Sequence, residues 1–186
     1  VSIELEKRIP AGGGLGGGSS NAATILKGLR RLYELDVSDD ELETIGLDLG
    51  ADVPFFIKGK TQIGNGVGEI LKPIETIING CYLLVAPNLH IDTKWAYSEL
   101  KNILDRPNEV VNFPGFIRKE IIPFELFEND FEAIVVPAYP EIGQIKKSLR
   151  VHGARFASLS GSGSTVFGVF DEDADAKSAE SHFSSR

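Results

Sequence analysis

Apolar residues recur at two different spacings near the start of the chain, and the spacing predicts the type of element. Ser2–Arg8 alternates polar and apolar residues, which predicts a half-buried strand. Residues 22–32 place apolar side chains three and four positions apart, which predicts a helix with Ser19 or Ser20 as its N-cap. The predicted apolar stripe is Ala22, Ile25, Leu26, Leu29 and Leu32, and the predicted solvated face holds Lys27, Arg30 and Arg31.

A second helix is predicted over Asp39–Leu49. The sequence SDDE at residues 38–41 is a capping box, and glycine at position 50 is a stop signal. The predicted buried stripe of this helix is Leu42, Ile45 and Leu49. Thr61–Leu71 then has two strand-like runs around a Gly/Asn turn, which predicts a hairpin.

The remaining two thirds of the chain alternate between strand-like and helix-like segments. The predicted elements are a buried strand at Tyr82–Val85, a helix capped by Thr93 that carries Trp95 and Tyr97, a loop over Asn102–Phe116, helices at Leu126–Val135 and Pro140–His152, strands at Arg155–Leu159 and Thr165–Phe170, and a last helix in Asp171–Phe183. In the helix from Pro140, the predicted buried stripe is Ile142, Ile145 and Leu149, and Gly153 is the predicted stop.

The most informative stretch is PAGGGLGGGSSNAA at Pro10–Ala23, between the first predicted strand and the first predicted helix. Six of the seven residues from Gly12 to Gly18 are glycine. Glycine allows positive φ and a close approach of the backbone to a ligand, and a helix start offers unpaired N–H groups and a positive dipole end. Together these features predict a cradle for phosphate groups. A flexible linker is the alternative, and the flanking strand and helix patterns disfavour it.

Composition narrows the classes of protein that fit. The chain has 186 residues, 42% of them hydrophobic, and a net charge of −8. Such an acidic chain disfavours nucleic acid as a partner, so an anionic ligand is expected to be held by backbone amides, a few cations and a metal ion. The sequence has no membrane-spanning stretch, and its three histidines, His90, His152 and His182, lack metal-ligand spacing.

Two further features of the composition concern the compartment and the ends of the chain. The single cysteine, Cys81, cannot form an internal disulfide, fits a reducing compartment and is predicted to be a core residue. The chain contains no methionine and opens in the middle of a predicted strand, so we expect it to be part of a longer protein.

Several known types of phosphate loop are alternatives for Pro10–Ala23. Gly12, Gly14 and Gly17 satisfy G-x-G-x-x-G, and Asp36 lies where a ribose-binding acid is expected in a dinucleotide fold. Against that fold, Pro10 separates strand from loop and no β-α-β return follows. A Walker A loop requires Lys and Ser/Thr after its last glycine, and a protein kinase requires V-A-I-K, H-R-D and D-F-G elements, none of which is present.

Two other stretches are candidates for function. Asp52 follows a predicted helix and precedes a proline and two aromatics. It is interpretable as a turn or capping aspartate, which the local pattern favours, or as a carboxylate with a tuned pKa. The small-residue turn SGSGS at residues 160–164 joins two predicted strands, and by itself it fits an ordinary hairpin as well as a functional loop.

One family accounts for the whole arrangement. Pro10–Ala23 resembles the second motif of the GHMP kinases, small-molecule kinases named after galactokinase, homoserine, mevalonate and phosphomevalonate kinases, and Ser160–Phe170 resembles their third, glycine-rich motif. The segments GLGGGSSNAA, LGADVPFFIKGK and GVGEIL are similar to the branch that acts on a cytidyl-diphospho-methylerythritol, as are NDFE at Asn129–Glu132 and PEI at Pro140–Ile142. The resemblance covers essentially the entire chain.

The resemblance implies a fold and an activity. The fold is α+β, with a ribosomal-protein-S5-domain-2-like N-terminal part (residues 1–78), a ferredoxin-like C-terminal domain (residues 79–186) and an active site in the cleft between them. The activity is ATP-dependent phosphorylation of the 2-hydroxyl of this small-molecule substrate, a step of the non-mevalonate route to isoprenoid precursors. The expected setting is the bacterial cytoplasm or a plastid stroma, as a monomer or homodimer, with no nucleic-acid or membrane partner.

The resemblance also implies roles for individual residues. Asp52 matches the catalytic aspartate, and the hydroxyl of Ser19 or Ser20 is the nearest candidate ligand for an ATP-bound Mg²⁺. The residues expected to wrap the ATP phosphates are Pro10, Ala11, Gly12, Gly13, Gly14, Leu15, Gly16, Gly17, Gly18, Ser19 and Ser20. Those expected to line the substrate cleft are Gly161, Ser162, Gly163, Ser164 and Thr165.

The chain departs from the family pattern at both ends. The family's opening segment, with a lysine, an asparagine and a substrate-reading histidine, has no counterpart here, nor has the final strand. Much of the adenine pocket belongs to that opening segment, so we expect this piece alone to be inactive. The alternatives are another small-molecule GHMP kinase, or a non-catalytic nucleotide-binding remnant of one.

Overall fold

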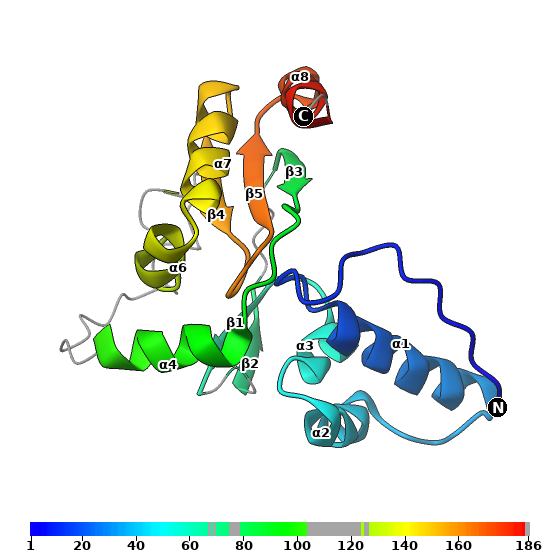
Figure 1. Ribbon diagram of the computed structural model, residues 1–186. Coiled ribbons are helices and arrows are strands. Elements are labelled where there is room, and N and C mark those ends of the chain that lie inside the picture. The colour runs from blue at the N-terminus through cyan, green and yellow to red at the C-terminus, as the bar shows by residue number, and fades with distance from the viewer. Residues whose placement is uncertain (67, 69, 75–78, 104–123, 125–126, 185–186) are drawn as a thin grey trace. The chain divides into compact units, whose positions relative to one another are not determined.

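The computed structural model describes residues 1–66, 68, 70–74, 79–103, 124 and 127–184, and the chain divides into two compact units (Figure 1). Unit 1 consists of Val1–Ala11 and Gly16–Ile77, and unit 2 of Gly12–Leu15 and Ile78–Arg186. Unit 1 contains α1 (Gly17–Leu32), α2 (Asp39–Leu49), α3 (Val53–Lys58), β1 (Gln62–Asn65) and β2 (Ile70–Pro73). Unit 2 contains β3 (Cys81–Val85), α4 (Thr93–Ile103), α6 (Glu132–Ala138), α7 (Pro140–Val151), β4 (Phe156–Leu159), β5 (Val166–Phe170) and α8 (Asp173–Ser184).

In unit 1, the three helices share a small apolar core. Ala23 of α1, Leu42 of α2, and Val53 and Ile57 of α3 are buried in one cluster. Helix α2 approaches α3 closely at Gly46, where a Cβ would lie 2.8 Å from Cδ1 of Ile57 and 2.9 Å from Cγ1 of Val53. The short helix α3 therefore packs against both longer helices (Figure 1).

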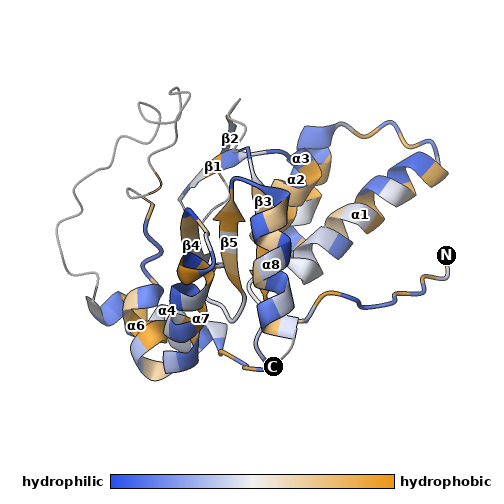
Figure 2. Ribbon diagram, turned by 90° about the horizontal axis from the view of Figure 1, so that it is seen from above, coloured by the Kyte–Doolittle hydropathy of each residue, from blue (hydrophilic) through white to orange (hydrophobic). Residues whose placement is uncertain are grey.

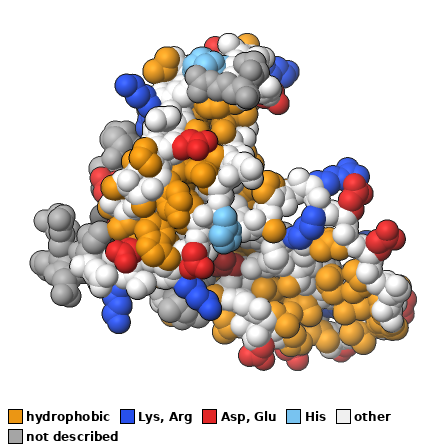
Figure 3. Space-filling model, viewed as in Figure 1, with side chains coloured by type: hydrophobic (Ala, Val, Ile, Leu, Met, Phe, Trp, Pro, Cys, Tyr) orange, Lys and Arg blue, Asp and Glu red, His pale blue; other side chains and the backbone are white. Residues whose placement is uncertain are grey.

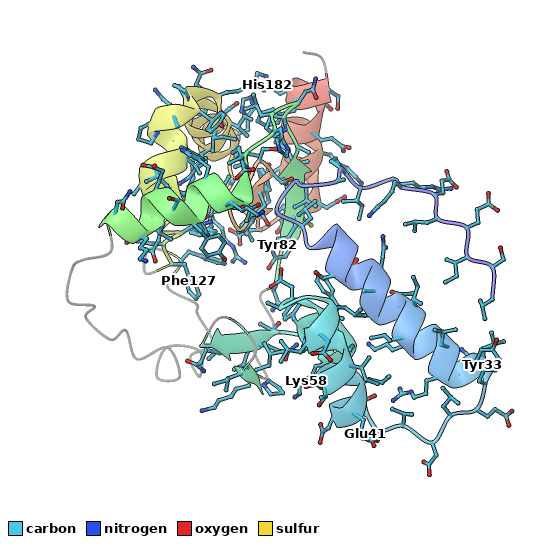
Figure 4. All side chains as sticks on the ribbon, turned by 60° about the horizontal axis from the view of Figure 1, so that its bottom comes forward. Tyr33, Glu41, Lys58, Tyr82, Phe127 and His182 are labelled. Carbon is cyan, nitrogen blue, oxygen red and sulfur yellow. The ribbon has the colours of Figure 1, made fainter. Side chains whose placement is uncertain are left out.

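The predicted capping box at the start of α2 is confirmed. The Ser38 hydroxyl accepts a hydrogen bond from the Glu41 backbone N–H at 3.2 Å, and the Glu41 carboxylate accepts one from the Ser38 N–H at 2.8 Å. The bond from the Ser38 backbone, helped by the Ser38 hydroxyl, lowers the pKa of Glu41 below its ordinary value of 4.5. Glu41 lies in the first turn of α2 (Figure 4), and Gly50 caps the other end of this helix, also as predicted.

The predicted hairpin in unit 1 is also confirmed. Strands β1 and β2 are antiparallel, with Gln62 opposite Pro73 and Asn65 opposite Ile70. The hairpin is tied to α3, since the Gln62 side-chain amide donates to the carbonyls of Phe55 and Gly59 at 3.0 and 2.9 Å.

The predicted strand at residues 2–8 is wrong. This segment has no regular secondary structure, and all of its residues are exposed. An alternating pattern forms a strand only where a neighbouring strand accepts its backbone hydrogen bonds, and none of the strands in the described part of the chain pairs with it.

The predicted apolar stripes of α1 and α2 are only partly buried. Periodicity identifies an apolar face but not what covers it. In Figure 3, hydrophobic side chains form a broad surface over these two helices, and Figure 4 shows Tyr33 just beyond the end of α1. The exposed apolar residues here are Leu32, Tyr33, Leu35, Ile45, Leu47 and Leu49, of which Leu32, Ile45 and Leu49 were predicted to be buried.

Unit 2 is built on an antiparallel sheet of three strands in the order β3-β5-β4. Leu159 lies opposite Val166, which confirms the hairpin predicted around the small-residue turn. Helix α7 packs against β4 and β5, and α8 packs against β3 and β5. Hydrophobic residues run along β5 (Figure 2), and Phe170 is fully buried in the core.

Helix α7 agrees with the sequence pattern. Its predicted stripe of Ile142, Ile145 and Leu149 is buried. The helix ends with His152 as its C-cap, and the predicted stop, Gly153, follows with φ of +97°. The helix buries this stripe in the same core that receives the alanines of α8, so the two helices stabilise one apolar cluster.

Other predicted details in unit 2 are corrected. Strand β3 is an edge strand with Tyr82 and Leu84 exposed, because an apolar run alone does not distinguish an edge strand from a central one. Cys81 is half-buried and packs on the core. The cap of α4 is Asp92, whose carboxylate accepts from the Trp95 N–H at 2.7 Å, rather than Thr93.

Two predicted boundaries are affected by the range that the structure describes. Helix α6 begins at Glu132, later than the predicted Leu126, which lies outside the described residues. Of the predicted loop over residues 102–116, residues 102 and 103 belong to α4, and the rest lies outside the described residues. No helix in the described ranges is long and apolar enough to cross a membrane.

Candidate phosphate-binding site

The first part of the glycine loop (residues 10–20) is held by the turn between β4 and β5, here called the serine–glycine turn (residues 160–165). The Thr165 backbone N–H donates to the Gly13 carbonyl at 3.1 Å, and the Ser160 hydroxyl donates to the Gly14 carbonyl at 2.7 Å. Ser160 and Gly14 are 146 positions apart in the sequence. The two glycine-rich stretches that the sequence singled out are thus joined within unit 2.

Gly14 requires glycine for two reasons. Its φ is +74°, a conformation that side chains disfavour. A Cβ at this position would also overlap the carbonyl oxygen of Ser160 and lie 2.9 Å from that of Gly163. Gly12 has the same φ but more space, since the nearest atoms to its Cβ position belong to the His90 ring at 3.8 Å. The glycine at position 14 therefore permits the close docking of loop on turn.

The serine–glycine turn is itself fixed by side-chain hydrogen bonds. The Ser164 hydroxyl donates to the Leu89 carbonyl at 2.7 Å, and the hydroxyls of Ser162 and Thr93 lie 3.2 Å apart. Of the predicted cleft residues, Gly161 is exposed, whereas Ser162, Gly163, Ser164 and Thr165 are buried. The Thr165 hydroxyl has no hydrogen-bond partner among the described residues.

The second part of the glycine loop, residues 16–20, starts α1 in unit 1. The cap is Gly16, in the left-handed conformation with φ of 62°, and the Ser20 N–H makes the first helical bond, to the Gly16 carbonyl at 2.9 Å. The prediction that Ser19 or Ser20 caps the helix is wrong, because both lie in its first turn. The amides of residues 17–19 precede the first helical bond and point out of the helix start, where the dipole is positive.

One lysine of unit 1 ties α1 to α3, and another lies near this helix start. Lys27 was predicted to face solvent, but its ammonium donates to the Phe56 carbonyl at 2.9 Å and so ties α1 to α3. The Lys7 ammonium lies 3.8 Å from the position that a Cβ on Gly17 would occupy. In the sequence, Lys7 stood out only as part of the predicted strand, and its position shortly before the glycine loop was the available signal.

Asp52 is the residue before α3, yet it does not cap this helix with its side chain. Its carboxylate is exposed, and it makes no hydrogen bond or ion pair with the described residues. One turn along α3, the Phe56 ring lies against Gly16, where a Cβ would be 2.7 Å from two ring carbons. Asp52 therefore belongs to the same packed unit as the start of α1, with its carboxylate free to meet a ligand.

The donors around the loop suit a phosphate ligand better than a bare metal ion. No group of three or more His, Cys, Asp or Glu side chains that could hold a metal comes together within the described residues. The Ser20 hydroxyl donates to the Gly17 carbonyl at 3.1 Å, which leaves its oxygen lone pairs free to bind a cation. A phosphate-bound Mg²⁺, which keeps most of its ligands from phosphate and water, fits one such hydroxyl.

Two protein-family models match this chain and show the family to which it belongs. The family model described as "GHMP kinases N terminal domain" matches residues 1–60, and "GHMP kinases C terminal" matches residues 120–186. The chain belongs to the GHMP kinase family. The first match contains the glycine loop and Asp52, and the second contains the serine–glycine turn.

Curated relatives within the GHMP kinase family share one name. The chain is 42% identical over 179 residues to the 4-diphosphocytidyl-2-C-methyl-D-erythritol kinase of Pelobacter propionicus, and this match covers 96% of the chain and 63% of the relative. It is 43% identical over 187 residues to the kinase of the same name from Syntrophotalea carbinolica, covering 100% of the chain and 66% of that relative. The chain therefore spans less than two thirds of the length of these relatives.

Solved structures confirm the GHMP kinase fold. A crystal structure of 4-(cytidine 5'-diphospho)-2C-methyl-D-erythritol kinase matches with a TM-score of 0.81 and 33% identity, covering 97% of this chain and 65% of that one. Homoserine kinase from Cytophaga hutchinsonii matches with a TM-score of 0.74 and 17% identity, covering 96% and 63%. The second likeness shows the fold alone. The predicted α+β, two-domain GHMP kinase architecture is confirmed.

Proposed function

We propose that this chain carries the phosphate-binding and catalytic residues of an ATP-dependent kinase that phosphorylates the 2-hydroxyl of 4-diphosphocytidyl-2-C-methyl-D-erythritol. The names of the relatives support the substrate. The observation that carries the proposal is the pair of hydrogen bonds from Thr165 and Ser160 to the Gly13 and Gly14 carbonyls, which join the two glycine-rich stretches.

The glycine loop is proposed to bind the ATP phosphates through its backbone. The docked carbonyls of Gly13 and Gly14 fix the loop, and the start of α1 adds unpaired amides and a positive dipole end. Such donors are needed in a chain with a net charge of −8, and the Lys7 ammonium adds a nearby cation. Pro10 and Ala11, which lead into the loop, are proposed to complete the phosphate-binding stretch through residues 10–20.

Asp52 is proposed to accept the proton of the attacking substrate hydroxyl, or to orient that hydroxyl. A general base must be free to reach the proton that it removes. The Asp52 carboxylate meets this condition, since it is exposed and makes no hydrogen bond to the amides of α3. Base catalysis of this kind contributes about 10²–10⁴-fold to a rate.

The remaining roles concern charge and the substrate side. Mg²⁺, when bound with ATP, neutralises charge that develops on the transferred phosphoryl group. The hydroxyl of Ser19 or Ser20 would hold it. Residues 161–165 are proposed to line the part of the site that faces the reacting groups, with the exposed Gly161 the most accessible of them.

The test is Asp52→Asn in the full-length protein, with Asp48→Asn as matched control. Both aspartates are exposed residues of unit 1, so the two variants differ in position rather than in chemistry. Asp52→Asn is expected to lower kcat by about 10²–10⁴-fold with little change in KM or melting temperature, because the lost interaction belongs to the transition state. Asp48→Asn is expected to keep the parent's kcat. An Asp52→Asn variant that keeps its kcat, or loses activity only by unfolding, would contradict the catalytic role.

A further inference from the structure

Asn129, just before α6, and Glu132, at its start, form hydrogen bonds with the end of β4 and the serine–glycine turn. The Asn129 side-chain amide donates to the carbonyls of Leu159 and Gly161, both at 2.9 Å. One Glu132 carboxylate oxygen accepts from the Ser158 hydroxyl at 3.0 Å and from the Leu159 N–H at 2.8 Å. Both side chains therefore hold backbone that leads directly into the turn.

The orientation of Asn129 is determined by its partners. A side-chain amide has two N–H donors and one acceptor oxygen. Both donors are directed at carbonyls, and the oxygen accepts from the Phe131 backbone N–H at 3.0 Å. The reversed orientation would place the oxygen against two carbonyl oxygens and the NH₂ group against an N–H. Asn129 is thus locked as a double donor to the residues on either side of Ser160.

Glu132 is anchored from the opposite side. Its second carboxylate oxygen forms an ion pair with Lys146 of α7, which compensates the charge of Glu132. Its first oxygen remains the acceptor for the Leu159 N–H at the end of β4. Glu132 fixes the strand end, and Asn129 fixes the turn that follows.

A chain of hydrogen bonds leads from Asn129 through the serine–glycine turn to the glycine loop. Asn129 binds the residues that flank Ser160, and Ser160 donates to the Gly14 carbonyl at 2.7 Å. At the far end of the turn, Thr165 donates to Gly13. The position of the glycine loop in unit 2 therefore depends on a turn whose first half is held by one asparagine.

We propose that Asn129 is a positioning residue for the glycine loop and that it sets the affinity for ATP without touching the nucleotide. The proposal rests on the proposed function, in which the glycine loop binds the ATP phosphates. Misplacement of binding groups by about 1 Å is enough to cost on the order of 100-fold in rate. Releasing the turn from Asn129 is expected to lower kcat/KM for ATP by about 10–100-fold, mainly through KM.

The test is Asn129→Asp in the full-length protein, with Gln144→Glu as matched control. The change keeps the shape of the side chain but places an oxygen against the Leu159 and Gly161 carbonyls. Gln144 is exposed on α7 and receives the same change in charge. The two measurements are titration of ATP binding and hydrogen exchange of the backbone amides. Steady-state kinetics with ATP accompanies them.

In Asn129→Asp, we expect weaker ATP binding and faster exchange confined to the Thr165 amide and its neighbours in the turn, and in Gln144→Glu neither effect. Parent-like ATP affinity and Thr165 exchange in a folded Asn129→Asp protein would overturn the proposal. So would a variant that only melts earlier, with exchange raised evenly through β4 and β5. If Asn129→Asp does not fold, Asn129→Ser, which removes the donors without adding charge, is measured in the same way.

The same experiment separates this inference from the proposed function. A parent protein that binds ATP but transfers no phosphate to the cytidyl substrate would contradict the proposed function, while the binding and exchange measurements would still decide the role of Asn129. A parent protein that does not bind ATP would overturn both.

Discussion

Replacing Gly14 by alanine tests the docking of the glycine loop on the serine–glycine turn. The new methyl group has no space, because it would overlap the Ser160 carbonyl oxygen and lie 2.9 Å from the Gly163 carbonyl oxygen. Both neighbours are backbone atoms in a turn held by several hydrogen bonds, so they cannot move aside as a flexible side chain would.

The expected loss of stability follows from two contributions. Holding alanine at φ of +74° costs about 1–2 kcal/mol. Forcing the extra methyl group against fixed backbone costs about 1–3 kcal/mol more. The free energy of unfolding of unit 2 is therefore expected to fall by about 2–5 kcal/mol, against a typical total of about 5–15 kcal/mol.

Two other glycines provide controls. Gly12→Ala has the same φ but open space beside it, so only the conformational cost of about 1–2 kcal/mol applies. Gly28 lies within α1 with nothing within 4 Å of its Cβ position, and alanine there is expected to stabilise the helix by about 0.5–1 kcal/mol.

The assay is urea unfolding followed by tryptophan fluorescence. The chain has a single tryptophan, Trp95, which lies in unit 2 with Gly12 and Gly14. We expect the midpoint to fall most for Gly14→Ala, less for Gly12→Ala and not at all for Gly28→Ala. Equal midpoints for Gly14→Ala and Gly12→Ala would refute the close approach of Gly14 to the turn.

Further predictions concern the two units separately. Ser38→Ala removes the capping box of α2 and is expected to cost about 1 kcal/mol in urea unfolding followed by circular dichroism. The Ser38 backbone N–H lowers the pKa of Glu41 in the folded state, so the contribution of this carboxylate is complete above its ordinary pKa of 4.5 and is lost as pH falls through the lowered value. The difference in stability between parent and Glu41→Gln should therefore shrink in acid, and a constant difference would contradict the role of the carboxylate. Phe170→Ala, in the core, is expected to cost about 3–5 kcal/mol, whereas Leu84→Ala, half-exposed on β3, should cost far less, and similar values for the two would refute the described core.

Features that depend on neighbours in the sequence could be predicted from it. The capping box at residues 38–41 needs only a serine and a glutamate three positions apart, and the stripe of α7 needs only regular spacing. The hairpin around residues 160–165 likewise follows from a small-residue turn between two apolar runs. In each case, the interaction is local or the pattern repeats often enough to be distinctive.

Features that depend on distant partners could not be predicted from the residues alone. Nothing local distinguishes Lys27, which bonds to the Phe56 carbonyl, from a solvated helix lysine. The N-cap of α1 is Gly16 rather than Ser19 or Ser20, because the cap residue has the left-handed conformation that glycine readily adopts. The division of the glycine loop between two units depends on Ser160 and Thr165, which are far away in the sequence.

The most direct test of the proposed function is a comparison of substrates with the full-length protein and ATP. Phosphate transfer to 4-diphosphocytidyl-2-C-methyl-D-erythritol, mevalonate, homoserine and galactose would be followed by ³¹P NMR of the products under identical conditions. We expect the cytidyl substrate to be phosphorylated at its 2-hydroxyl with a higher kcat/KM than the other three. A higher kcat/KM with any of those three, or no transfer to the cytidyl substrate, would contradict the proposed function.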